Sequence, residues 1–152
     1  MCHQMPDGMD FETGALLEPY CVGLHAVKLA SIKKGDGVVI LGCGTIGMMT
    51  LMAAGYYNPG TVIISDLSSS KREMARLIGA NVAFNPVETE PVSFVRDHTG
   101  ESGADIVFVT APNKEVINQA LKMTRRKGKV ILVATLPGDT EITTGEIQMH
   151  ER

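Results

Sequence analysis

The most constraining feature of the chain is a run of apolar, mostly β-branched residues that turns abruptly into three regularly spaced glycines. Val38–Leu41 is followed by Gly42, Gly44 and Gly47, and an apolar segment without a helix breaker then extends to residue 54. In a strand–turn–helix unit that binds a dinucleotide, the first glycine permits the tight turn and the second lets the backbone approach a pyrophosphate. The third lets the helix pack closely on the sheet. The amides at the helix start, aided by the helix dipole, would then face the phosphates.

A second strand-like run ends in an acidic residue at the distance that this unit requires. Thr61–Ser65 precedes Asp66, which lies nineteen residues after Gly47. A carboxylate in this place accepts hydrogen bonds from both ribose hydroxyls of an adenosine, and its charge repels a 2′-phosphate. The pattern therefore favours NAD over NADP. The structural alternative is a simple glycine turn followed by an aspartate that caps the next helix.

The composition is that of an ordinary globular domain and excludes several other classes. The chain has 152 residues, 44% hydrophobic and 20% charged, with a net charge of −3. This balance does not indicate a nucleic-acid partner or an anionic membrane surface, and no apolar run approaches the roughly 18 residues of a membrane span. The three cysteines form no close pair, which argues against a disulfide framework and predicts a cytoplasmic location.

The chain alternates between strand-like and helix-like segments. The strand-like segments are almost continuously apolar, as in a parallel sheet that helices cover on both faces. Because each strand–helix–strand unit crosses over right-handed, we expect an α/β Rossmann fold, a doubly wound parallel sheet in the order 3-2-1-4-5. The expected strands are Val38–Leu41, Thr61–Ser65, Asn81–Phe84, Ile106–Thr110 and Val130–Ala134, and the expected helices are Thr45–Ala54, Ser70–Ile78, Val92–His98 and Lys114–Arg125.

The segment before the first strand is helical in pattern but contains a proline. Phe11–Ala30 is interrupted by Glu18 and Pro19. A residue that precedes proline is pushed out of the helical region of backbone space. We therefore expect a break at Glu18 between two short helices.

A basic cluster follows the last expected helix. Arg125–Lys129 contains four cationic residues around one glycine. We interpret them as cations at a helix C-terminus, where the helix dipole favours positive charge. A nucleic-acid or phosphate site is disfavoured because no second basic stripe accompanies them.

Several stretches of the chain match the patterns of one enzyme family. They are Cys2-His3-Gln4-Met5-Pro6-Asp7, Asp10–Pro19, Val22–Val27, Gly42-Cys43-Gly44-Thr45-Ile46-Gly47, Asp66–Lys71 and Leu77-Ile78-Gly79-Ala80. Together they resemble the medium-chain zinc-dependent dehydrogenases, within them most closely the polyol (sorbitol) and threonine dehydrogenase branch. The resemblance covers Cys2 to about Leu136. It implies hydride transfer between a secondary alcohol and NAD in the full enzyme, with zinc polarising the substrate hydroxyl.

The resemblance also implies a role for individual positions. The glycine loop would hold the pyrophosphate, the residues after the second strand would hold the adenosine ribose, and the ends of the fourth and fifth strands would lie beside the nicotinamide. By position, the pyrophosphate is assigned to Gly42, Gly44, Thr45, Ile46 and Gly47, the adenosine ribose to Asp66 and Lys71, the nicotinamide side to Thr110 and Val133, and an approach to the catalytic zinc to Glu18.

The family pattern extends beyond this chain. Its members carry a preceding catalytic domain with the zinc ligands, and they continue to a sixth strand. We therefore expect residues 1–30 to be a leading linker with helices and residues 31–152 to be an NAD-binding domain. This domain would not bind zinc and would be inactive alone, with an alcohol substrate bound only when the missing domain is present. Cys2-His3 aligns with a linker and is not expected to form a zinc site. The unpaired strand Val130–Ala134 predicts a homo-oligomer.

Two further functions remain open from the sequence. The glycine loop also resembles that of methyltransferases that use S-adenosylmethionine. Those usually have an acid just before the first glycine, where this chain has Ile40 and Leu41, and they do not need Gly47. The other possibility is a non-catalytic NAD-binding module.

Overall fold

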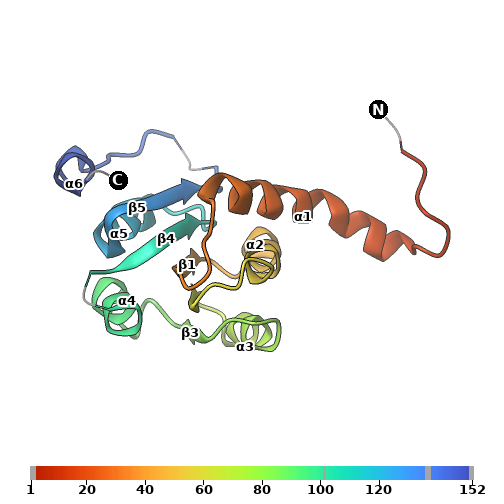
Figure 1. Ribbon diagram of the computed structural model, residues 1–152, viewed down its shortest axis with the longest axis horizontal. Helices are drawn as coiled ribbons and strands as arrows, with labels where there is room; N and C mark the ends of the chain where they lie inside the picture. Colours follow the sequence, from red (N-terminus) through yellow and green to blue (C-terminus); the bar gives the residue numbers. More distant parts are fainter. Residues whose placement is uncertain (1–2, 101, 136–137, 151–152) are drawn as a thin grey trace.

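Five parallel strands form a single sheet with helices on both faces (Figure 1). The computed structural model describes residues 3–100, 102–135 and 138–150. The strand order is β3-β2-β1-β4-β5, which confirms the expected doubly wound topology. The strands are β1 (Gly37–Leu41), β2 (Thr61–Ser65), β3 (Val82–Phe84), β4 (Ala104–Val109) and β5 (Thr124–Leu132).

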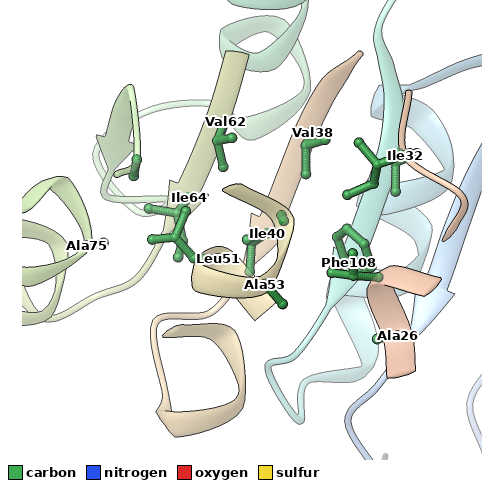
Figure 2. Close-up of a cluster of buried hydrophobic side chains, with 14 of the residues drawn as sticks. Ala26, Ile32, Val38, Ile40, Leu51, Ala53, Val62, Ile64, Ala75 and Phe108 are labelled. Atoms are coloured by element: carbon green, nitrogen blue, oxygen red, sulfur yellow. The ribbon is translucent and has the colours of Figure 1, made fainter. Parts of the chain in front are cut away.

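The helices divide between the two faces of the sheet. Because neighbouring residues of a strand point to opposite faces, Val38 and Ile40 pack toward one set of helices and Val39 and Leu41 toward the other. Figure 2 shows the first core, where α1 and α2 meet β1, β2 and β4. Burial on both faces explains the continuous apolar strands. The helices are α1 (Phe11–Ala30), α2 (Thr45–Gly55), α3 (Ser69–Leu77), α4 (Pro91–Thr99), α5 (Lys114–Met123) and α6 (Thr144–His150).

The expected break at Glu18 is wrong, because α1 is one continuous helix with Pro19 inside it. Proline has no amide to donate to the carbonyl four residues earlier. That carbonyl belongs to Ala15, which is exposed, so water can satisfy it. The first half of α1 projects beyond the sheet (Figure 1), while the second half packs on α2. The approach is close at Gly23, where an added Cβ would lie 2.7 Å from a backbone nitrogen of α2.

The basic cluster belongs to β5 and not to a helix end, so its interpretation as a set of helix-capping cations is wrong. Helix α5 stops at Met123, and β5 starts at the next residue. The pairing with β4 is irregular here, since its register shifts between Ala104 and Ile106. Arg125 forms an ion pair with Asp105, which lies between these two residues.

A second cation of the same cluster connects the sheet to α1. The Lys129 Nζ donates a hydrogen bond of 2.8 Å to the Ala30 carbonyl at the end of that helix. Local sequence patterns cannot indicate these two partners, since Asp105 and Ala30 lie 20 and 99 residues from the cations that they bind. Among the described helices, none is long and apolar enough to cross a membrane.

Replacing Asp105 by alanine tests how this edge of the sheet is held. The Asp105 Oδ2 accepts a hydrogen bond of 2.7 Å from the amide of Gly37, at the start of β1. The variant leaves that partly buried amide without its acceptor, so the free energy of unfolding should fall by about 1–2 kcal/mol in urea titrations. The control is Asp97→Ala on α4, an exposed aspartate, which should change it by less than about 0.5 kcal/mol. Equal effects of the two variants would contradict the role of Asp105 as the acceptor for the Gly37 amide.

Candidate functional site

The glycine turn lies where β1 ends and α2 begins, at the carboxyl edge of the sheet. Gly42 has a φ of +114°, a region that side chains disfavour. An added Cβ at Gly47 would lie 2.0 Å from the Gly42 carbonyl oxygen, so no larger residue fits there. Gly44 is different, because an added Cβ there would meet no atom within 4 Å. The fold itself thus requires Gly42 and Gly47, whereas Gly44 borders open space.

The start of α2 offers backbone amides to this open space. Gly44 is the N-cap residue and supplies no side-chain acceptor, and the first turn of the helix carries no acidic residue. The first amides of a helix have no partner within the helix, and the dipole makes this end partly positive. Gly44 and Thr45 are both exposed. This arrangement fits the diphosphate of a dinucleotide.

Asp66, half-buried, follows β2 directly and links this strand to the glycine turn. Its Oδ2 accepts a hydrogen bond of 2.8 Å from the Cys43 amide, and its Oδ1 accepts one of 2.9 Å from the Ser68 amide. The N-cap of α3 is Ser68 and not Asp66. A carboxylate has about four acceptor positions, so two remain for further donors. The carboxylate is therefore held beside the turn and can still accept hydrogen bonds from a ligand.

Thr110 supports the turn from the other side, where β4 ends. Its Oγ1 lies 3.0 Å from the carbonyl oxygens of both Leu41 and Gly42 and donates to them. The strands on either side of β1 thus each supply a side chain that fixes the glycine turn. Sequence reasoning singled out Thr110 as a nicotinamide neighbour and missed this supporting contact.

Cys43 is the central residue of the turn, and its thiol is buried. The Sγ donates a hydrogen bond to the Ser65 carbonyl. Burial, with a further contribution from the charge of Asp66, raises the pKa of this thiol to about 12. The side chain therefore fills space between β1 and β2 as a neutral group.

A cavity of about 390 Å³ opens beside Gly42 and Asp66. Its walls come from the loops after β2, β3 and β4 and from the first turns of α5. Motif analysis missed these residues, because no pattern marks them; the only available signal was that the loops after parallel strands meet at one edge of the sheet. The lining residues that motif analysis did not single out include Pro86, Val87, Pro91, Glu115, Val116 and Gln119.

Two of the remaining candidate residues border a different groove. Glu18 on α1 and Val133 after β5 both line an open groove of about 480 Å³, together with Cys21 and His25. Over residues 3–100, 102–135 and 138–150, no three His, Cys, Asp or Glu side chains form a group that could hold a metal ion. The described part of the chain thus supplies no complete zinc site. Cys2 lies outside the described residues.

Lys71, the other residue assigned to the adenosine ribose, lies exposed on α3. Its neighbour Arg72 is oriented by the backbone, since its Nη1 donates to the carbonyl oxygens of Asp66 and Leu67, each at 2.8 Å. Ile46 is half-buried in the first turn of α2. Lys71 and Ile46 therefore lie on the two elements that border the carboxylate and the glycine turn.

Comparison with known proteins assigns this architecture to a family. The family model described as zinc-binding dehydrogenase matches residues 45–152. The chain belongs to the zinc-binding dehydrogenase family. A sorbitol dehydrogenase of Bacillus subtilis (strain 168) is 34% identical over 138 residues, which are 91% of this chain and 39% of that protein.

Two further relatives agree with this assignment. The uncharacterized zinc-type alcohol dehydrogenase-like protein YdjJ of Escherichia coli (strain K12) is 38% identical over 148 residues, 93% of this chain and 43% of that protein. The crystal structure of a putative zinc-binding dehydrogenase from Sinorhizobium meliloti 1021, bound to NADP, superposes with a TM-score of 0.91 and 31% identity. That match covers 98% of this chain and 45% of that chain.

The chain spans about 40% of the length of these relatives. It corresponds to the coenzyme-binding part of zinc-dependent alcohol and polyol dehydrogenases, as the sequence resemblance implied. The methyltransferase and the non-catalytic module are not favoured.

The state of Cys43 can be tested by alkylation of the native chain in a Cys2→Ser background. Below the ordinary thiol pKa of 9.0, the exposed Cys21 should react with iodoacetamide while Cys43 stays unmodified until urea is added. Mass spectrometry of the two cysteine peptides gives the readout of the alkylation. Because the pKa of the Cys43 thiol is raised in the folded state, its ionisation opposes folding. The free energy of unfolding should therefore fall as the pH rises from 9.0 toward about 12. Modification of Cys43 at the rate of Cys21 would contradict its burial.

Proposed function

We propose that this chain binds NAD as the coenzyme domain of a zinc-dependent dehydrogenase that oxidises a secondary alcohol or polyol. Residues 31–152 form this domain in our proposal. The observation that carries it is the open space at Gly44 beside the uncapped start of α2, with the Asp66 carboxylate hydrogen-bonded to the same turn. A diphosphate and its attached ribose need these two features side by side.

Each part of the coenzyme has proposed partners. The diphosphate lies against the turn and the first amides of α2, and the hydroxyls of the adenosine ribose donate hydrogen bonds to the Asp66 carboxylate. The supporting residues are Gly42, Gly44, Thr45, Ile46 and Gly47 for the diphosphate, Asp66 and Lys71 for the ribose, and Thr110 and Val133 for the nicotinamide side.

Selectivity for NAD follows from the charge of Asp66. Within the residues that the structure describes, no cation forms an ion pair with this carboxylate, and the nearby Arg72 donates to backbone carbonyls instead. An unneutralised carboxylate repels a 2′-phosphate. The NADP-bound relative from Sinorhizobium meliloti means that family membership alone does not decide between the two coenzymes.

The chemical step requires more than this chain. Zinc, when bound in the whole protein, would polarise the alcohol, and its ligands other than Glu18 would come from outside the described residues. Glu18 is proposed to approach that metal from α1, since it lines the same groove as Val133. We accordingly expect no dehydrogenase activity from the 152-residue chain alone, and binding of the alcohol only in the whole protein.

Two proposals concern the setting of the protein. The free thiols of Cys21 and Cys43 support a cytoplasmic location. In the described part of the sheet, β5 is an edge strand, and self-association through this edge remains a prediction.

Replacing Asp66 by asparagine should relax the selectivity against NADP. The variant keeps one side-chain acceptor for the turn but removes the negative charge, so the preference for NAD over NADP should shrink about tenfold or more in calorimetric titrations. The control is Glu73→Gln on α3, an exposed acidic residue that does not line the cavity. An unchanged preference in Asp66→Asn would remove this carboxylate from the ribose site.

Replacing Gly44 by valine separates binding from folding. Its φ of −70° is ordinary and the site has open space, so the domain should stay folded. The side chain would occupy the path of the diphosphate and lower the affinity for NAD at least about tenfold, since several charge-assisted hydrogen bonds would be lost. The control is Gly55→Ala at the far end of the same helix, also in open space, which should bind NAD normally. Normal binding by Gly44→Val would overturn the assignment of the turn.

A further inference from the structure

One side of the cavity beside Asp66 is lined by polar side chains of α5. Glu115 and Gln119 lie four residues apart on α5, so they share one helix face, and both line the cavity. Glu115 is exposed and Gln119 is half-buried. In the described structure, neither side chain forms a hydrogen bond or an ion pair. These groups are available to a ligand.

The rest of the cavity wall is largely apolar. Leu67 comes from the loop after β2, Pro86 and Val87 come from the loop after β3, and Val116 lies on α5 between the two polar residues. Apolar walls with a few polar groups on one side suit a flat heteroaromatic ring. The faces of such a ring pack against the apolar side chains, and its edge forms hydrogen bonds with the polar groups.

Covalent connectivity brings a base to this place, and this step rests on the proposed function. If the diphosphate lies at the glycine turn and the ribose at Asp66, the base on that ribose must lie next to Asp66. The cavity is lined by both Gly42 and Asp66, so it begins where the ribose is held. In this binding mode, the base comes within reach of α5.

We propose that Glu115 and Gln119 bind the 6-amino edge of adenine and make the chain selective for adenine over a 6-oxo purine. Adenine presents an amino donor beside ring nitrogen acceptors, and a glutamine amide pairs with this edge through its own acceptor and donor. A carboxylate only accepts hydrogen bonds. A 6-oxo purine replaces the amino donor by a carbonyl acceptor, which the Glu115 carboxylate repels.

The selectivity is measured by calorimetric titration of the full chain with NAD and with nicotinamide hypoxanthine dinucleotide. The two ligands differ only in the base, so they make the same contacts to the turn and to Asp66. The hypoxanthine dinucleotide should bind about tenfold more weakly, since it would leave polar groups of the site without partners.

Variants assign the selectivity to the helix face. Glu115→Gln combined with Gln119→Leu should bind the two dinucleotides nearly equally, mainly by losing affinity for NAD. Glu12→Gln is the matched control, because Glu12 occupies the same first-turn position on α1 and does not line the cavity. It should keep the full discrimination.

The outcomes separate this inference from the function on which it rests. Tight binding of NAD with equal binding of the hypoxanthine dinucleotide would overturn the base-edge inference and leave the coenzyme proposal standing. A selectivity that persists in the double variant would also overturn it. Failure of the folded chain to bind either dinucleotide would overturn the proposed function, and the base-edge inference with it.

Discussion

The structure depends on how closely α2 approaches the end of β1. The Gly42 carbonyl occupies the place that a side chain at Gly47 would need, so the helix start lies directly over the carboxyl edge of the sheet. Asp66 from the β2 side and Thr110 from the β4 side then hold the turn through backbone amides and carbonyls. The start of α2, where we propose that the diphosphate binds, is thus fixed before any ligand arrives, which would lower the entropic cost of binding.

The sheet could be predicted from the sequence because its central strands are buried on both faces. Val38–Leu41 and Thr61–Ser65 are covered on both faces, and continuous apolar runs of this kind are typical of central parallel strands. Boundaries set by distant partners could not be predicted. Pro19 lies inside α1 because packing on α2 outweighs one lost hydrogen bond at an exposed turn. Arg125 belongs to β5 because its partner is Asp105.

The candidate site likewise has one part that could be predicted from the sequence and one part that could not. Glycine spacing and the acid after the second strand are local signals with a direct physical cause, so the turn and Asp66 were accessible to sequence reasoning. The cavity was not, because loops that share only a position at the sheet edge build it. Pro86 and Gln119 belong to no motif, and their proximity follows from the strand order. Their place in the cavity wall is visible only once the chain is folded.

The proposed function requires that the glycine turn and the first turn of α2 bind the diphosphate of a dinucleotide. Backbone amide NMR during a titration of the wild-type chain with NAD measures this most directly. The amide signals of Gly44, Thr45 and Ile46 should shift together with that of Cys43, whose amide donates a hydrogen bond to Asp66. Saturable binding of NAD that shifts other amides and leaves these four unchanged would contradict diphosphate binding at the turn.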